Sequence, residues 1–479
     1  MAVSPPPQLE LADPPAARPA RRASGFGALL LRLHFYTGIL IAPFLVVVAV
    51  TGLLYTVTPQ LDQMLYGDKL TVTAGNATVP LADQIATARA AHPAGTLTAI
   101  QPGSGSDSTR VVFSLPDLEE KQHTVYVDPH TGTALGQLTT WYGSTPVTTW
   151  LDDLHRNLHL GDLGRHYSEL AASWLWVLAL GGLILWWRRR RSLRGVLTPD
   201  MAAKKGVRRT RGWHAATGVW ISVGLLVLSA TGLTWSRYAG GNFTTALDSL
   251  DAHAPTLDVA AAPALDVAAA PALGGAAAPA ASGGHHGGSA AVALADPAQA
   301  DTVVRVARDN GLTGTVELTV PETATAPWTV AGIDNVWPVG LDRIAVDPAS
   351  ATVVARSDFA DWPVLAQLSK LGVQAHMGVL FGVVNQVLLA ALAVGLLCVI
   401  LWGYRMWWQR RPTRADRRRA MAGAPPARGG WLGLPAWAIV VGVPVVFAVG
   451  WAMPLLGVTL VAFLLVDAVV GGVRDSRTS

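Results

Sequence analysis

Six apolar runs, each long enough to cross a membrane as a helix, constrain the fold of this 479-residue chain more than any other feature. A bilayer core of roughly 30 Å requires about 20 apolar residues in a helix. Charged residues make up only 14% of the chain, whereas soluble domains carry about one quarter. The sequence therefore predicts a polytopic α-helical membrane protein with about six transmembrane helices. They lie at 26–58, 166–187, 212–236, 373–404 and, as a C-terminal hairpin split at Pro454, within 431–473.

Basic residues predict which side of the membrane each loop occupies. Lys and Arg accumulate in short cytoplasmic loops, and the loops 188–211 and 405–430 are rich in both. We therefore expect these loops, the disordered N-terminus 1–25 and the C-terminus to be cytoplasmic. Segments 59–165 and 237–372 are then extracytoplasmic, in a multi-pass protein of the cell membrane. The basic charge is a topology signal and does not indicate a nucleic-acid partner. The first run is too long for a signal peptide, so we expect it to be retained.

The cysteine content excludes several kinds of site. The chain has one cysteine, Cys398, inside the fourth predicted helix. Disulfides within the chain, iron–sulfur clusters and covalently attached c-type haem all need more cysteines than this. The extracytoplasmic segments must therefore be held together by packing alone.

An internal duplication organises the chain. His34, Thr37 and Gly38 are followed by Thr51-Gly52-Leu53, and the same residue types recur at His214, Thr217 and Gly218 and at Thr231-Gly232-Leu233. Every matched residue is displaced by 214 − 34 = 180 positions. The first and third predicted helices are therefore copies of one element.

The two extracytoplasmic segments also resemble each other. Val127-Asp128-Pro129 and Val346-Asp347-Pro348 each follow apolar residues, a pattern that predicts a β-hairpin. A helical stretch precedes each turn, at Leu81 to Ala91 and at Ala300 to Asn310. Two α+β modules result, and the Ala/Pro/Gly-rich stretch 255–293 before the second is predicted to be a flexible insertion.

The returning helices carry histidines in similar settings. His159-Leu160-Gly161 resembles His376-Met377-Gly378, and the next arginine follows each histidine by 188 − 159 = 405 − 376 = 29 residues. The repeating unit is therefore helix, module, helix, used twice. The last two helices are an addition outside the repeat.

Ionisable residues in membrane helices are costly, and each one is a functional hypothesis by default. The repeat brings His34 near His214 at the cytoplasmic side, and His159 near His376 at the outer side. Facing imidazoles in a helical bundle suit six-coordinate haem b, which takes one axial nitrogen from each side. We therefore predict two haem b groups, with these four histidines as axial ligands of the iron. His155 lies four residues before His159 and is an alternative ligand.

Four arginines near the proposed sites have two possible roles. They are suited to pair with haem carboxylates, and equally to anchor the helices at the membrane interface. These residues are Arg32, Arg156, Arg165 and Arg211.

Together these features resemble the PepSY-associated transmembrane family, which includes iron-regulated membrane proteins and inner-membrane reductases of ferric siderophores. The resemblance covers roughly 25–410 and rests on His34-x-x-Thr-Gly, Leu154 to Gly161, His376-x-Gly and the turn from Val127 to Gly132. It implies a di-haem b reductase that passes electrons outward to ferric complexes, with PepSY-like modules outside. The second module departs from the pattern, because Ala351 replaces the turn glycine.

The leading hypothesis is a di-haem b membrane reductase that transfers electrons from the cytoplasmic side to an extracytoplasmic ferric siderophore complex. The sequence has no G-x-G-x-x-G or phosphate-binding loop, so the donor must be a separate flavin reductase or a membrane quinol. The remaining partner is the lipid bilayer. No catalytic residue is assigned.

A different class of function remains open. PepSY modules are associated with peptidase inhibition, so the alternative is a binding or regulatory membrane protein that controls a peptidase or senses metal without redox activity. It predicts no cofactor, and replacing His34 or His376 should then change only stability. A transporter is less favoured, because no helix-breaking motif recurs in mid-membrane in both halves.

Overall fold

The computed structural model describes residues 25–188, 197–199, 203, 205–257, 296–323, 326–411, 426, 428 and 433–476. The expected N-terminal segment before 25, the insertion from 258 to 293 and large parts of both basic loops lie outside these residues. The main helices are α1 (Gly25–Leu40), α2 (Ala42–Tyr55), α3 (Thr58–Leu70), α4 (Leu81–Ala91), α5 (Pro146–Asn157), α6 (Gly161–Trp187), α8 (Val207–Leu233), α9 (Tyr238–Ser249), α10 (Gln299–Asp309), α11 (Val364–His376), α12 (Val383–Gln409), α13 (Ala436–Ala452) and α14 (Pro454–Ser476). The strands are β1 (Thr96–Gln101), β2 (Thr109–Ser114), β3 (Gln122–Val127), β4 (Ala134–Thr140), β5 (Val316–Thr319), β6 (Trp328–Gly332), β7 (Arg343–Asp347) and β8 (Thr352–Ser357).

Three described helices, α6, α8 and α12, are long and apolar enough to cross a membrane, at 27 residues each. A fourth span results if α1 and α2, which meet at an angle of 58°, are counted together. The apolar parts of α13 and α14 are shorter. The chain is therefore a helical membrane protein with three or four spans supported by its described residues, rather than the six expected.

The bend between α1 and α2 has a local cause. Pro43 lies in the first turn of α2 and has no backbone N–H, so the carbonyl of Ile39 loses its intrahelical donor. The hydroxyl of Tyr404, on α12, donates to that carbonyl at 2.9 Å. A neighbouring helix thus satisfies the acceptor that the proline leaves without a partner. The corresponding helix of the second half, α8, is continuous.

All eight strands form one antiparallel sheet in the order β4-β3-β2-β1-β5-β6-β7-β8. Each half of the chain contributes a four-stranded meander, and the meanders join where β1 pairs with β5. In that junction Ala99 lies opposite Thr319 and Ile100 opposite Leu318. The two expected modules are therefore halves of one continuous sheet.

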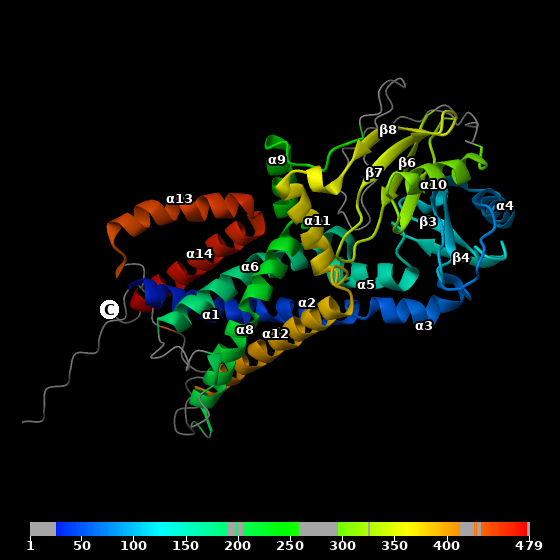
Figure 1. Ribbon diagram of the computed structural model, residues 1–479. Helices are drawn as coiled ribbons and strands as arrows, with labels where there is room; N and C mark the ends of the chain where they lie inside the picture. The colour runs from blue at the N-terminus through cyan, green and yellow to red at the C-terminus, as the bar shows by residue number, and fades with distance from the viewer. Residues whose placement is uncertain are drawn as a thin grey trace, which may run out of the picture.

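One face of the sheet and the helices α4 and α10 enclose a shared apolar core. A carboxylate strengthens the link, because Asp301 of α10 accepts hydrogen bonds from the backbone N–H groups of Leu81 and Ala82 at the start of α4. Figure 1 shows α4 and α10 on this face, and α3 and α5 on the side toward the helical bundle. The largest fully buried core side chains are Ile85, Ile100, Val111, Phe113, Val125, Val127, Leu318, Trp328 and Ile344.

The predicted hairpins are confirmed as β3–β4 and β7–β8. Asp128 and Asp347 each accept a hydrogen bond from the backbone N–H two residues later, which closes the turn in the same way. Gly132 has a φ of 71° and Ala351 a φ of 54°. Ala351 therefore adopts the left-handed conformation that Gly132 adopts without strain.

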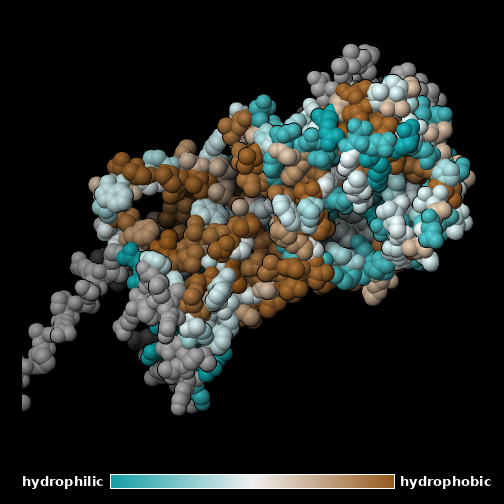
Figure 2. Space-filling model, viewed as in Figure 1, coloured by the Kyte–Doolittle hydropathy of each residue, from teal (hydrophilic) through white to brown (hydrophobic). Residues whose placement is uncertain are grey.

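The surface divides the molecule into two parts. Figure 2 shows hydrophobic residues gathered over the helices and hydrophilic residues over the sheet. Large apolar side chains are exposed on α12 and α13, among them Val384, Val387, Val440 and Phe447. Apolar surface of this extent fits contact with lipid.

The C-terminal hairpin, α13 and α14, packs beside the first half of the repeat. Arg32 of α1 forms an ion pair with Asp467 of α14 and is only 4% exposed. The indole N–H of Trp174, on α6, donates to Thr459 of α14 at 2.9 Å. These contacts hold the added helices against α1 and α6.

Candidate functional site: two histidine pairs

The structure places a pair of histidines beneath the sheet, named here the sheet-side pair. His155 on α5 and His376 on α11 have ring centroids 6.5 Å apart. The Nδ1 atom of His155 lies 2.9 Å from the hydroxyl oxygen of Thr51, and that of His376 lies 2.7 Å from the hydroxyl oxygen of Thr231. The two Thr-Gly motifs of the repeat therefore hold the two histidines in the same way.

The threonines determine which ring nitrogen carries the proton. The hydroxyl of Thr51 donates to the carbonyl of Val47 at 2.8 Å, and that of Thr231 donates to the carbonyl of Val227 at 2.8 Å. Each hydroxyl oxygen therefore accepts a hydrogen bond from the Nδ1–H group of its histidine. In a neutral imidazole the Nε2 lone pair is then free to bind a metal.

The glycine of each motif makes room for the ring. A Cβ atom at Gly52 would lie 3.0 Å from Cε1 of His155, and one at Gly232 would lie 3.4 Å from Cε1 of His376. The helices α5 and α11 lie outside the candidate spans. Burial lowers the pKa of His155 and His376 to about 4, so both imidazoles are neutral near pH 7.

His159 does not join this pair, contrary to the preference drawn from the sequence. It is exposed and has a φ of 56°, and its ring stacks 4.9 Å from that of Trp150. The helix α5 ends at Asn157, and the chain then reverses so tightly that a Cβ at Gly164 would meet the Asn157 carbonyl oxygen. Because the helix stops before residue 159, His155 faces His376 and His159 does not.

A signal for this assignment exists in the sequence. His155 and His376 are 376 − 155 = 221 residues apart, and so are Trp186 and Trp407, whose Trp-Trp pairs lie near the ends of α6 and α12. The match through His159 gives 376 − 159 = 217 and breaks this correspondence. The shared x-Gly pattern was therefore less informative than the aromatic pairs.

A second pair, named here the loop-side pair, lies near the basic loops. The rings of His34 on α1 and His214 on α8 have centroids 6.4 Å apart. Nδ1 of His214 donates to the carbonyl of Val399 at 2.9 Å, which leaves its Nε2 available. Glycines again adjoin the rings, Gly182 at His34 and Gly403 at His214. These glycines are also 403 − 182 = 221 residues apart.

Both pairs fit one metal between their rings. Two imidazoles on opposite sides of one metal have centroids roughly 6.3 Å apart, since each bond is about 2.0 Å and the ring centre lies about 1.1 Å behind its nitrogen. The observed distances are 6.4 and 6.5 Å. Nδ1 of His34 is buried and has no hydrogen-bond partner among the described residues.

A free metal ion is a poorer match to these sites. Among the described residues no group of three or more His, Cys, Asp or Glu side chains could hold one. Each pair offers two nitrogens only. This suits a metal whose remaining ligands come from a macrocycle, as in haem b.

Three of the four arginines named from the sequence make protein contacts. Arg32 pairs with Asp467, Arg165 donates to the carbonyl of Trp235, and Arg156 pairs with Asp152 and Asp153. These contacts fit the anchoring role.

Comparison with known proteins identifies the family. No curated protein matches the chain. The family model described as the PepSY-associated TM region matches residues 31–410, most of the chain, including both histidine pairs and the sheet. This chain therefore belongs to the PepSY-associated transmembrane family.

Proposed function

We propose that this protein is a di-haem b membrane reductase that moves electrons from the cytoplasmic side to an extracytoplasmic ferric complex, such as a ferric siderophore. The observation that carries the proposal is the pair of matched histidine spacings, 6.4 and 6.5 Å between ring centroids. The two pairs lie at opposite ends of α8: His214 near its start, and Thr231, which holds His376, near its end. One site on each side of the membrane is the arrangement that electron transfer across it requires.

The axial ligands we propose differ in one respect from those expected from the sequence. His34 and His214 would hold the loop-side haem, and His155 and His376 the sheet-side haem. Haem b, when bound, supplies one-electron redox chemistry at iron. The protein orients the imidazoles through Thr51, through Thr231 and through the Val399 carbonyl. Such partners of the second ring nitrogen fix the ring and raise the basicity of the ligand.

The charge of the loops supports the membrane orientation that the proposal uses. The positive-inside rule places the basic loops in the cytoplasm and the sheet outside. Each ferric complex takes up one electron and becomes ferrous, and the donor on the cytoplasmic side loses that electron. The sheet lies beside the sheet-side pair and is the part of the chain that an external acceptor would meet (Figure 1).

The visible spectrum tests this function. The purified protein, expressed with ample haem, should show a Soret band and, after dithionite reduction, two haems per chain. Replacing His34 or His214 should remove the loop-side haem alone, and replacing His155 or His376 the sheet-side haem alone. Absence of any Soret band from folded protein would refute the proposal and favour the binding or regulatory function.

A further inference from the structure

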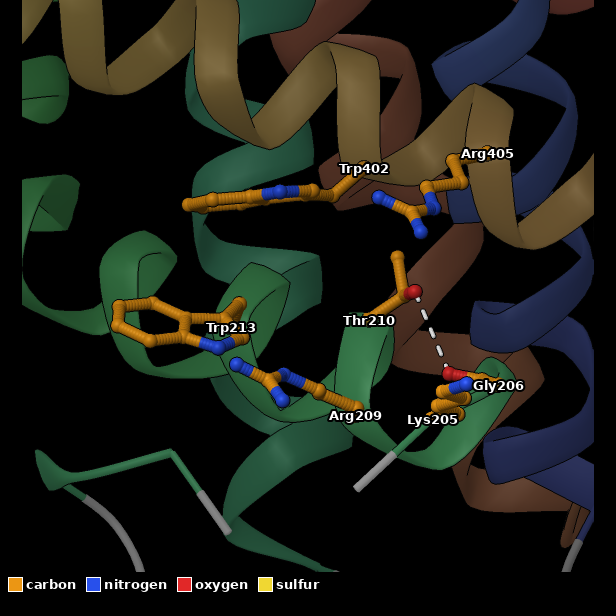
Figure 3. Close-up of a pocket in the computed structure, with 7 residues that line it drawn as sticks. All are labelled: Lys205, Gly206, Arg209, Thr210, Trp213, Trp402 and Arg405. Atoms are coloured by element: carbon orange, nitrogen blue, oxygen red, sulfur yellow. Dashed lines mark hydrogen bonds between the residues drawn. The ribbon is translucent and has the colours of Figure 1, made fainter. Parts of the chain in front are cut away.

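A cavity of about 590 Å³ opens between the start of α8 and the end of α12. Pockets for small organic ligands commonly measure about 300–1,000 Å³. It is lined by Lys205, Gly206, Arg209, Thr210, Trp213, Trp402 and Arg405 (Figure 3). None of the four paired histidines lines it, so the cavity is a separate feature at the same end of the molecule as the loop-side pair.

The lining of this cavity favours an anion. Three of its seven lining residues, Lys205, Arg209 and Arg405, carry positive charge, and none of the seven is acidic. The first turn of α8 begins at the cavity, after Gly206 with a φ of 84°, and the N–H groups of a first turn have no intrahelical acceptor. Guanidinium groups bind phosphate through paired, charge-assisted hydrogen bonds. A phosphate group is therefore the anion that best fits the site.

The opposite wall favours a flat ring. The indoles of Trp213 and Trp402 have centroids 6.0 Å apart and planes at 38°, so they contact each other and form one aromatic wall, named here the wedge, against which a flat ring can stack. Figure 3 shows the guanidinium of Arg209 beside the indole of Trp213, and that of Arg405 beside the indole of Trp402. A ligand with an aromatic ring and a phosphate would meet both surfaces at once. A lipid headgroup offers only the phosphate, and a quinol only the ring.

The wedge is directly connected to the loop-side pair. Trp213 precedes His214 in α8, and Trp402 precedes Gly403, where a Cβ would lie 3.8 Å from Cε1 of His214. A ring stacked against the wedge therefore lies one residue along each helix from His214 and from Gly403, which adjoins it. Because the cavity is this close to His214, a small molecule bound in it is well placed to donate electrons to the loop-side pair.

We propose that this cavity binds a planar aromatic redox carrier that bears a phosphate, of the flavin mononucleotide class, as the cytoplasmic electron donor. This inference rests on the proposed reductase function for its biological role. The reduced flavin gives up two electrons and two protons in becoming oxidised. The protons pass to the cytoplasm, and the two electrons reduce two external ferric complexes to the ferrous state.

Flavin mononucleotide itself is the probe that tests the site. The full-length protein in phosphatidylcholine nanodiscs is titrated with oxidised flavin mononucleotide, and binding is followed by quenching of flavin and tryptophan fluorescence. Saturable binding is expected. Riboflavin, which has the same ring and no phosphate, should bind at least about tenfold more weakly, since it cannot form the charge-assisted hydrogen bonds of the phosphate.

Two variants and two matched controls localise the binding. Arg405→Gln and Trp402→Leu should each weaken flavin mononucleotide binding about tenfold, through the lost charge and the lost stacking surface. Arg411 packs over Trp408 at 4.3 Å, farther along the same helical end, and neither residue lines the cavity. Arg411→Gln and Trp408→Leu should therefore leave the affinity unchanged.

Three results would overturn the flavin site: no saturable binding, an affinity that Arg405→Gln leaves unchanged, or equal affinity for riboflavin.

The same titration in nanodiscs that contain phosphatidylglycerol tests whether a lipid headgroup competes for the cavity. Displacement of the flavin by this anionic lipid would assign the cavity to a lipid headgroup, and retained binding would support the flavin. The Soret band of the same samples separates the two proposals. Haem without flavin binding refutes only the donor site, whereas flavin binding without haem refutes the reductase.

Discussion

The two halves of the repeat agree at the histidines and differ where the C-terminal hairpin packs. Thr51 holds His155 as Thr231 holds His376, and Gly182 adjoins His34 as Gly403 adjoins His214. The position equivalent to Arg32 is 32 + 180 = 212, a glycine, and the one equivalent to Trp174 is 174 + 221 = 395, also a glycine. Only the first half therefore carries the two side chains that bind α14.

The equivalent positions Trp174 and Gly395 contact different parts of the molecule. The second half uses the space at Gly395 for the side chain of Ile221, which a Cβ there would approach to 2.9 Å. In the first half Trp174 reaches Thr459 instead. The threonine and glycine contacts of the histidines recur in both halves, whereas the outer faces of the helices contact different neighbours. Four changes test this comparison, described from the largest expected effect to the smallest.

The largest effect is expected at the sheet-side pair. His155→Ala and His376→Ala should each abolish sheet-side haem binding, because either change removes one of the two nitrogens that we propose as ligands of the haem iron. His159→Ala is the matched control, and it should leave two haems per chain since that ring lies against Trp150. Haem content per chain and the reduced spectrum measure the outcome. Loss of a haem in His159→Ala, with none in His155→Ala, would reverse the assignment.

The second change removes the ion pair that only the first half has. Asp467→Asn leaves the buried Arg32 without its carboxylate, and breaking a buried pair costs roughly 3 kcal/mol. The thermal midpoint of the protein in detergent, followed by tryptophan fluorescence, should fall by several degrees. Asp162→Asn, in the solvent-exposed pair with Arg237, is the control and should change the midpoint little. Equal shifts in both variants would contradict the role given to α14.

The third change tests whether the halves are equivalent at the sites. Thr51→Val and Thr231→Val each remove the acceptor for Nδ1 of a histidine in the sheet-side pair. Loss of such a partner typically weakens metal binding about 10- to 100-fold. We expect the two variants to lower the affinity for the sheet-side haem by similar factors, measured by transfer of haem to apomyoglobin. A large effect from only one threonine would show that the halves are not equivalent.

The smallest effect is expected at the hairpin turns. Ala351→Gly should stabilise the protein by about 0.5–1 kcal/mol, because glycine adopts a φ of 54° without the strain that alanine carries. Gly132→Ala should destabilise it by a similar amount, because alanine is strained at a φ of 71°. The added Cβ would not clash, since its nearest neighbour, Val79, would lie 3.6 Å away. Thermal midpoints of the two variants should therefore move in opposite directions. Movement in the same direction would argue against equivalent turns.

Much of the fold was predictable because the patterns that specify it are local. Apolar runs indicated the membrane helices, Asp-Pro turns indicated the hairpins, and the 180-residue displacement indicated the repeat. The length of each span was less predictable. The proline at 43 bends the first run, and the apolar parts of α13 and α14 are shorter than the helices that qualify as spans.

The sequence also predicted some of the paired histidines but not all of them. His34, His214 and His376 were found from the repeat, and the structure places each in a pair. For the partner of His376 the sequence pattern favoured His159 and left His155 as the alternative, because the choice between them depends on where α5 ends. Leu158 and His159 both adopt left-handed conformations that non-glycine residues rarely take, so residue types alone did not predict the stop.

The sequence by itself determined a duplicated membrane protein with histidines at both ends of its helices. Only the tertiary structure decided that its two modules form one sheet and that His155 faces His376. The physical reason is the distance along the chain over which the deciding interactions act. Hydropathy, turns and spacing act among near neighbours, whereas the pairing of Ile100 with Leu318 and of His155 with His376 depends on packing between residues more than 200 positions apart, as 318 − 100 = 218 and 376 − 155 = 221 show.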